Sequence, residues 1–357
     1  MSNSIMRRSL LLLAIGCGGA NAPPARTAAP AAFEFREIEV RIPARGLDLE
    51  GTLAVPRGRG PRPAVVLVQG SGPLGRDEVL PGQLGIMFGF DVAVFRELGR
   101  ELARAGFVVI RYDKRTCTAV EGCHNAYPQA DVGFDDVLDD SQAVIDWLRA
   151  RPEVDRRALY VVGHSLGGAF VPELMTDNRD LRAGIVLAAP YRPIDLTSIY
   201  QWEYAERLLL SQNKHPLVIA ARVHELKEIA EGVRRLRAGT LKKADIAGTS
   251  VEFWQAWMDL GDALPAVLAR LDRPVLALSG AADANVPPSE TALWQRSLAA
   301  ARPDPGHEVL VLDCVSHALN CIRTDRRGRP IAIARHLDPR VPARIITFLR
   351  RHAPRPR

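Results

Sequence analysis

One serine stands where it could act as a nucleophile. The run Gly163-His164-Ser165-Leu166-Gly167-Gly168 follows an apolar stretch, 158–162, and precedes a helical pattern. A serine at a sharp turn from strand to helix presents its hydroxyl outward, and small flanking residues are needed because the turn is tight. The N–H of Leu166, at the helix start, can hold negative charge at the same place. We therefore predict Ser165 as a nucleophile and Leu166 as an oxyanion donor.

The segments on either side of this turn alternate between strand and helix patterns. Short apolar runs are typical of parallel strands covered on both faces, and they occur at 64–68, 107–110, 159–162, 185–188, 275–278 and 309–312. Helical patterns separate them, at 92–105, 137–149, 167–175, 290–298 and 342–351. Residues 36–42 and 47–55 alternate polar and apolar, which suits an antiparallel pair at a sheet edge. The alternation predicts an α/β fold with a mostly parallel sheet covered by helices.

One stretch interrupts this rhythm. Residues 191–268 show no strand pattern and contain charged amphipathic helical patterns at 204–210 and 223–236. An insert between the strands 185–188 and 275–278 would form a helical lid over the strand ends. A helical decoration without a gating role is the alternative, although long inserts in compact domains are more often functional.

Several phrases resemble one known family, the α/β-hydrolase superfamily, and within it the bacterial secreted esterase and serine aminopeptidase-like branch. Besides the serine turn, the phrases are Glu50-Gly51-Thr52-Leu53, Gln69-Gly70-Ser71-Gly72-Pro73 with Arg76-Asp77, Arg111-Tyr112-Asp113-Lys114-Arg115, and Phe253-Trp254. The resemblance implies an α/β-hydrolase fold with a helical lid insert. The sequence departs from the family where Thr116-Cys117 follows Lys114-Arg115 and where Gln69 replaces a frequent His.

The resemblance implies an acid and a base that follow the serine in the order Ser, Asp or Glu, His. Asp283 lies in the loop after the run 275–278, where the family places its acid, and His317 lies in the loop after 309–312, where the family places its base. Asp259 and Asp262 are the alternative acids. Four of the other histidines fit less well as bases by order and context: His164, His215, His224 and His307.

The same resemblance implies a second oxyanion donor in the turn after the run 64–68, and by position it is the N–H of Ser71. In the implied reaction, His317 accepts the proton of Ser165 as the serine attacks a carbonyl carbon, and Asp283 fixes the tautomer of His317. The N–H groups of Ser71 and Leu166 hold the oxyanion, and the acyl-enzyme is then hydrolysed. This reaction requires no metal and no organic cofactor.

The preferred substrate is a small-molecule carboxylic ester or another short acyl compound, which predicts a carboxylesterase-like enzyme of class EC 3.1. A serine aminopeptidase-like peptidase is the alternative, and it needs an acid to hold the substrate amine, for which the lid offers Glu203, Glu225 and Glu228. A thioesterase is a third choice. A non-catalytic binding lipoprotein on the same scaffold is the alternative of another class.

The first residues are typical of an export signal. Arg7 and Arg8 precede an apolar run, 10–15, which small residues follow. The segment Leu13-Ala14-Ile15-Gly16-Cys17 resembles a bacterial lipoprotein signal, with Ala14 where Leu is usual. An ordinary cleaved signal with an incidental Cys17 is the alternative. We predict an exported protein of the bacterial cell envelope, lipid-anchored at Cys17 and facing the periplasm or the cell surface.

These patterns divide the chain into consecutive parts. The Gly-, Ala- and Pro-rich stretch after Cys17 cannot bury enough surface to fold and therefore suits a tether. The predicted parts are a lipoprotein signal peptide, 1–16, a flexible tether, 17–33, the first part of the hydrolase core, 34–190, the helical lid, 191–268, and the second part of the core, 269–357.

The remaining cysteines and the charges agree with export. Besides Cys17 there are two closely spaced pairs, Cys117 with Cys123 and Cys314 with Cys321, which predict two local disulfides. Four cysteines allow three pairings, and a zinc site is the rival interpretation. The net charge is +6, with Lys and Arg interleaved with Asp and Glu along the chain. This pattern argues against a nucleic-acid partner, which requires a clustered basic patch.

Overall fold

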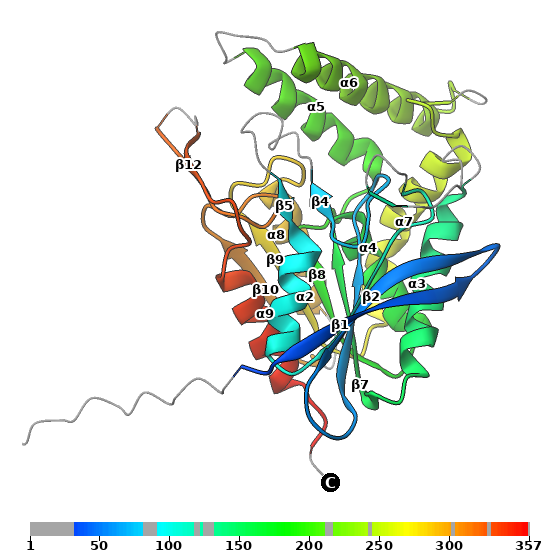
Figure 1. Cartoon of the computed structure of the whole chain (residues 1–357). Coiled ribbons are helices and arrows are strands. Elements are labelled where there is room, and N and C mark those ends of the chain that lie inside the picture. Colours follow the sequence, from blue (N-terminus) through cyan, green and yellow to red (C-terminus); the bar gives the residue numbers. More distant parts are fainter. Residues whose placement is uncertain are drawn as a thin grey trace, which may run out of the picture. The chain divides into compact units, whose positions relative to one another are not determined.

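A central sheet organises the residues that the computed structural model describes, which are 32–80, 91–117, 122–123, 132–210, 217–241, 245–300, 304–326 and 330–355. Within them, eight strands pair in the order β1-β2-β6-β3-β7-β8-β9-β10 (Figure 1). Their bounds are β1 Phe35–Ala44, β2 Leu47–Pro56, β3 Arg62–Val68, β6 Val108–Tyr112, β7 Val154–His164, β8 Leu181–Leu187, β9 Val275–Gly280 and β10 Glu308–Leu312. The predicted signal peptide, Cys17 and nearly all of the predicted tether lie outside the described residues.

The sheet is antiparallel at one edge and parallel elsewhere. The first pair, β1 and β2, is antiparallel and lies at the sheet edge, and β2 also pairs antiparallel with β6. From β6 to β10 all pairings are parallel. The strands in the middle of the sheet carry apolar residues toward both faces, and their side chains are buried almost throughout. The predicted α/β architecture with an antiparallel edge is confirmed.

Helices cover both faces of this sheet. On one face lie α3 (Phe134–Arg149), α4 (Leu166–Asp177), α7 (Val251–Ala269) and α8 (Pro288–Ala300), which share one apolar core with the sheet. On the other face lie α2 (Val94–Arg104) and α9 (Arg340–Arg351), which form a second core (Figure 1). Each helix turns an apolar stripe inward, as α9 does with Val341, Ile345 and Phe348.

The insert forms helices, as the sequence predicts. It contains α5 (Ile194–Leu210) and α6 (Leu217–Arg237), which lie beyond the end of the sheet in Figure 1, and α7, which returns to the sheet. The three helices share a small apolar core of their own, with Val233 and Met258 fully buried. Burial of such a side chain contributes about 1.5–3 kcal/mol. The insert therefore has internal packing as well as contact with the rest of the chain.

Some short elements were not predicted. A two-residue pair joins β4 (Val79–Leu80) to β5 (Val92–Ala93), so the helix expected from Val92 begins at Val94. A second small hairpin joins β11 (Ile322–Thr324) to β12 (Pro330–Ile333). Strands this short show no alternation in the sequence that a pattern could reveal.

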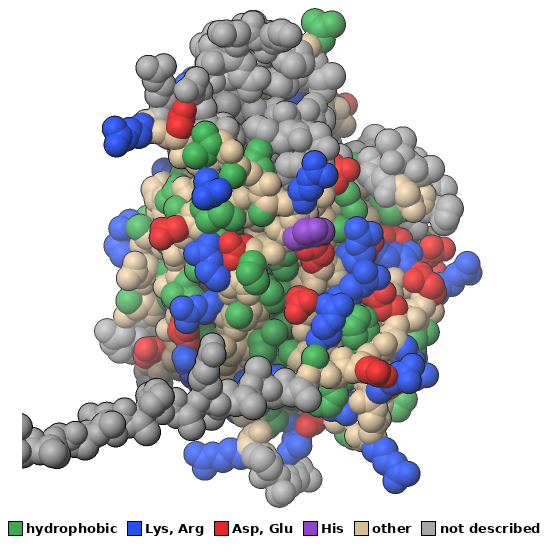
Figure 2. Space-filling view, turned by 60° about the vertical axis from the view of Figure 1, so that its left-hand side comes forward, with side chains coloured by type: hydrophobic (Ala, Val, Ile, Leu, Met, Phe, Trp, Pro, Cys, Tyr) green, Lys and Arg blue, Asp and Glu red, His purple; other side chains and the backbone are tan. Residues whose placement is uncertain are grey.

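The surface carries charges of both signs. On the face shown in Figure 2, Lys and Arg side chains lie interspersed with Asp and Glu. Many of the described Arg residues form ion pairs, such as Arg100 with Glu37 at 2.7 Å and Arg149 with Asp180 at 2.6 Å. Among the described residues, every helix is too short or too polar to cross a membrane.

Candidate active site

Ser165 occupies the turn between β7 and α4. Its φ of 53° and ψ of −121° lie in a region that residues other than glycine rarely adopt, at a cost of about 1–3 kcal/mol. The turn is tight, because a β-carbon on Gly163 would lie 2.0 Å from the carbonyl oxygen of Gly167. The N–H of Ser165 donates to the carbonyl of Leu187 in β8 at 2.9 Å. The sheet thus holds the serine in a strained conformation, as the sequence predicts for a nucleophile.

The predicted acid and base meet at the ends of β9 and β10. Nδ1 of His317 lies 3.0 Å from Oδ2 of Asp283, and both side chains are buried. The other carboxylate oxygen, Oδ1, accepts the N–H groups of Asn285 and Val286, each at 2.8 Å. A carboxylate that accepts these bonds places the hydrogen of the neutral imidazole on Nδ1, which leaves Nε2 as the basic nitrogen.

The two loops that carry this pair are fastened to each other. The N–H of Ala282 in the acid loop donates to the carbonyl of Val315 in the base loop at 2.9 Å. This close approach requires Gly280, because a β-carbon there would lie 1.9 Å from the Val315 oxygen. The disulfide Cys314–Cys321 closes the base loop around His317. The structure therefore contains the predicted bridge around the predicted base.

Contacts between neighbours bring Ser165, His317 and the turn after β3 to the same place. Nε2 of His164, the residue before the serine, lies 2.8 Å from the backbone oxygen of His317. A β-carbon built on Gly70 would lie 3.0 Å from the β-carbon of Ser165. The carboxyl ends of β3, β7 and β10 thus bring together the predicted oxyanion turn, nucleophile and base, in that order.

A buried lysine, Lys114, binds the backbone of the turn after β3. Nζ of Lys114 donates to the carbonyls of Gly70 at 2.8 Å and Gly72 at 3.0 Å. The N–H of Gly70 donates to Glu78 at 2.8 Å, so it is engaged within the protein. The next N–H of the turn is that of exposed Ser71, the predicted donor. The other predicted donor, Leu166, is the first residue of α4, where N–H groups lack an intrahelical acceptor.

Residues of the segment 111–115 link this turn to the end of β6 and link the segment itself to α3. The carboxylate of Asp113, at the end of β6, accepts the backbone N–H of Arg76 at 2.6 Å and two N–H groups of its guanidinium, at 2.6 and 3.1 Å. Arg115 forms a buried bidentate pair with Asp140 of α3, at 2.6 and 2.8 Å. Bidentate pairs of this kind fix geometry as well as charge.

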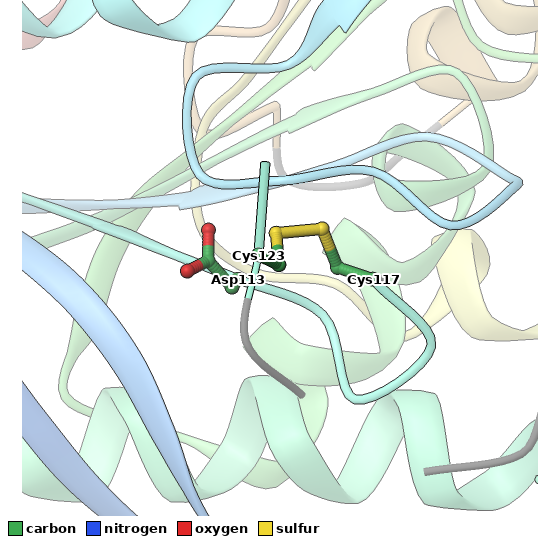
Figure 3. A group of neighbouring side chains, drawn as sticks. All are labelled: Asp113, Cys117 and Cys123. Carbon is green, nitrogen blue, oxygen red and sulfur yellow. A yellow bond between two sulfur atoms is a disulfide. The ribbon is translucent and has the colours of Figure 1, made fainter. Parts of the chain in front are cut away.

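The second predicted disulfide lies behind the same turn. Cys117 and Cys123 are buried and joined to each other, beside Asp113 (Figure 3). Gly75 approaches the bridge so closely that a β-carbon there would lie 3.1 Å from Sγ of Cys123. The pairing agrees with the spacing in the sequence, and it supports the loop whose sequence departs from the family phrase.

Sequence reasoning missed a buried polar pair in this site. The sequence patterns predict no role for either His164 or Glu78. In the structure both are almost fully buried, and Nδ1 of His164 lies 3.0 Å from Oε1 of Glu78. The one sequence signal concerns Glu78, which directly follows Arg76-Asp77 of the family phrase. Lys114 likewise has no predicted role. Burial lowers its pKa to about 8, although the charges of Glu78 and Asp140 oppose this.

The first insert helix touches the acid loop. Oη of Tyr200 in α5 donates to the backbone oxygen of Asp283 at 3.3 Å, and Nε2 of Gln201 donates to that of Asn285 at 3.1 Å. Burial, with the charge of Asp283, raises the pKa of Tyr200 to about 12. Tyr200 therefore stays a neutral donor at physiological pH, and the insert is anchored beside the site.

The alternative acids and bases lie elsewhere. Asp262 pairs with Arg237 of α6 at 2.5 Å, and exposed Asp259 accepts from Gln255 at 2.8 Å. His307 accepts the N–H of Val275 at the opposite end of β9 from Asp283. His224 is exposed on α6, and His215 lies outside the described residues. The structure brings Asp283, and neither alternative acid, to His317.

Comparison with known proteins identifies the family. A model described as "Serine aminopeptidase, S33" matches residues 88–320. The chain belongs to this family of α/β-hydrolases. Esterase EstD of Thermotoga maritima is 29% identical to this hydrolase over 317 residues, covering 87% of this chain and 66% of EstD. The hydrolase thus spans about two thirds of the length of EstD.

Solved structures share the fold of this hydrolase. Est1E from Butyrivibrio proteoclasticus, in a structure with ferulic acid, has a TM-score of 0.54 and 15% identity, covering 88% of this chain and 98% of Est1E. An acylaminoacyl peptidase of Pyrococcus horikoshii also has a TM-score of 0.54 and 15% identity, covering 90% of this chain and 42% of the peptidase. At identities this low, the structural similarity shows the α/β-hydrolase fold alone, whereas membership of the family supports a hydrolase activity.

Proposed function

We propose that the chain is a serine hydrolase that cleaves carboxylic esters through an acyl-enzyme on Ser165. The observation that carries the proposal is the buried pair of His317 and Asp283, with Nδ1 and Oδ2 3.0 Å apart, beside the strained turn that holds Ser165. The pair leaves Nε2 of His317 as a base. In a strand-to-helix turn of this kind the serine hydroxyl is exposed to a substrate carbonyl.

The reaction follows from these positions. Nε2 of His317 accepts the hydroxyl proton of Ser165 as Oγ bonds to the ester carbonyl carbon. The N–H groups of Ser71 and Leu166 hold the resulting oxyanion, and Asp283 stabilises the imidazolium. The imidazolium returns its proton to the leaving alcohol. Water, activated by the same base, then releases the acid and regenerates Ser165.

The surroundings of the site favour an ester over a peptide. An aminopeptidase needs an acid to hold the substrate amine, and the three lid candidates lie on the surface. Glu203 and Glu225 pair with their helix neighbours Arg207 and Arg222, and Glu228 is exposed. The name of the relative EstD supports the same choice, whereas the family description keeps a peptidase as the second candidate.

Turnover of two substrate sets tests the proposal. The purified protein comprising residues 34–357 is compared with its Ser165→Ala variant. The substrates are p-nitrophenyl esters of increasing chain length and aminoacyl p-nitroanilides. We expect ester hydrolysis that is lost in the variant. Ser165-dependent turnover of anilides alone would favour the peptidase. The absence of Ser165-dependent turnover on both sets would contradict the hydrolase proposal and favour the non-catalytic binding protein.

We also propose that the hydrolase is exported and lipid-anchored at Cys17. The run before Cys17 resembles a lipoprotein signal, and two disulfides in one chain are typical of an oxidising compartment. Expression in a bacterial host with radiolabelled palmitate tests this. We expect label in the membrane fraction of the wild type and none on Cys17→Ser. Unlabelled wild-type protein would contradict the anchor.

A further inference from the structure

A buried carboxylate and imidazole lie directly behind the site. Glu78 is 0% exposed and His164 is 1% exposed, so neither side chain can contact a substrate in solution. Glu78 belongs to the loop that carries Ser71, and His164 precedes Ser165. The reaction proposed above gives neither residue a role. A buried ionisable pair is costly to desolvate, so its presence beside a site calls for a function.

The pair links the three loops of the site. Oε1 of Glu78 accepts the N–H of Gly70 at 2.8 Å and lies 3.0 Å from Nδ1 of His164. Nε2 of His164 lies 2.8 Å from the backbone oxygen of His317. The imidazole of His164 therefore stands between the oxyanion turn and the base loop, in the same turn as the nucleophile. Its ring lies 4.8 Å from the His317 ring, centroid to centroid.

The acceptors around the ring determine where its hydrogens lie. A backbone carbonyl can only accept, so Nε2 must carry a hydrogen. Oε1 of Glu78 accepts from Gly70. When Glu78 is a carboxylate, Oε1 accepts from Nδ1 as well, and both ring nitrogens then carry hydrogens. Burial lowers the pKa of His164, but the charge and hydrogen bond of Glu78, the carbonyl of His317 and the charge of Asp283 together raise it above its usual value.

Other charged groups face the pair from each neighbouring element. Asp283 and His317 approach His164 from the loops after β9 and β10, and Lys114 approaches Glu78 from the end of β6. Phe95 of α2 packs edge-on against the imidazole. The acidic neighbours Glu78 and Asp283 favour the protonated ring.

We propose that Glu78 and His164 form a positioning pair for the hydrolase reaction. Doubly protonated His164 holds the backbone of the base, His317, while Glu78 holds the turn that carries the Ser71 N–H. The pair thereby fixes base and oxyanion donors relative to Ser165. The inference rests on the proposed function, since it assigns a role in that reaction.

The variant Glu78→Gln separates this role from simple packing. The amide keeps the size of the side chain, but Gly70 and His164 both contact the single atom Oε1. With the amide oxygen there, neutral His164 cannot donate to that oxygen and to the backbone oxygen of His317 at once. With the amide nitrogen there, Gly70 lacks an acceptor. Protonated His164 can still make both bonds, so the defect should be smallest at low pH.

The test compares kcat and KM of wild type and Glu78→Gln on a p-nitrophenyl ester between pH 6 and 9. We expect kcat of the variant to fall roughly 10- to 100-fold at pH 8 with KM little changed, and the ratio of variant to wild type to recover toward pH 6. Glu97→Gln is the matched control, because Glu97 also contacts a histidine and a backbone N–H, at 3.1 and 2.8 Å, away from the site. It should leave kcat unchanged.

A spectroscopic readout does not depend on the variant. In the ¹⁵N spectrum of histidine-labelled wild type, we expect hydrogens on both ring nitrogens of His164 at pH 7, assigned by loss of the signals in His164→Asn. A singly protonated His164, or a Glu78→Gln/wild-type ratio of kcat that is near one or equal at all pH values, would overturn the inference in an active enzyme. A wild type without Ser165-dependent turnover would instead overturn the proposed function, and the positioning role with it.

Discussion

Replacement of Asp283 by asparagine should reverse the tautomer of His317. In the structure Oδ1 of Asp283 accepts the N–H groups of Asn285 and Val286, each at 2.8 Å, while Oδ2 faces His317. Two donors require an oxygen at the Oδ1 position, so the amide nitrogen of the asparagine must face the imidazole. That nitrogen donates to Nδ1, which then lacks a hydrogen. Nε2 carries the hydrogen instead and cannot accept the proton of Ser165.

The expected loss follows from this reversal. A base held in the wrong tautomer lowers kcat by about four orders of magnitude, or about 5 kcal/mol of activation free energy. KM should change little, because the buried carboxylate does not contact substrate. The assay is the steady-state hydrolysis of a p-nitrophenyl ester by wild type and Asp283→Asn, with the midpoint of thermal unfolding measured to show that the variant is folded.

A matched control is available on α7. Asp259 is exposed and accepts one bond from Gln255 at 2.8 Å, so Asp259→Asn should leave kcat within a factor of two. The reasoning would be refuted if folded Asp283→Asn kept kcat within tenfold of wild type. If Asp259→Asn or Asp262→Asn lost activity instead, the acid would be one of those two residues.

The remaining predictions concern the supports of the site. Lys114→Met should lower kcat about tenfold, because the turn carbonyls lose their donor; ester kinetics checks this, and wild-type kcat would show that the lysine does not hold the turn. Burial lowers the pKa of Lys114 to about 8, below the unfolded value of roughly 10.4. Between these values the unfolded state binds the proton that the folded state has lost, so the free energy of unfolding of wild type should rise by up to about 3 kcal/mol between about pH 8 and 10. Lys114→Met should lack this rise. Urea unfolding measures this free energy, and an equal pH dependence in both proteins would contradict the lowered pKa of Lys114. The double variant Cys314→Ser/Cys321→Ser should lose about 2 kcal/mol of stability and part of kcat, because the disulfide closes the base loop; undiminished kcat would show that the bridge does not rigidify this loop.

The main elements of the fold could be predicted from the sequence because their signals are local. The run 64–68 is apolar at every position and forms buried β3, and the glycines around Ser165 mark a tight turn. Asp283 and His317 were implied by the resemblance to the family, because each follows such a run at the place where the family has its acid or its base. The disulfides followed from short cysteine spacings.

The polar network behind the site could not be predicted, because its contacts join distant parts of the chain. Glu78 and His164 are 86 positions apart, and their bond depends on the path of an irregular loop. Lys114 is buried, although lysine is almost always exposed, so its residue type suggested a surface position. The pair of β4 and β5 is two residues long in each strand, which is too short to show a pattern.

Chemical trapping of the nucleophile tests the central claim most directly. The purified chain is treated with a fluorophosphonate, which reacts with activated serines, and the adduct is located by mass spectrometry of peptides. We predict one adduct, on the peptide that contains Ser165, and its disappearance in His317→Ala, which removes the base. An unlabelled chain, or an adduct on another residue, would contradict the assignment of Ser165 as a nucleophile activated by His317.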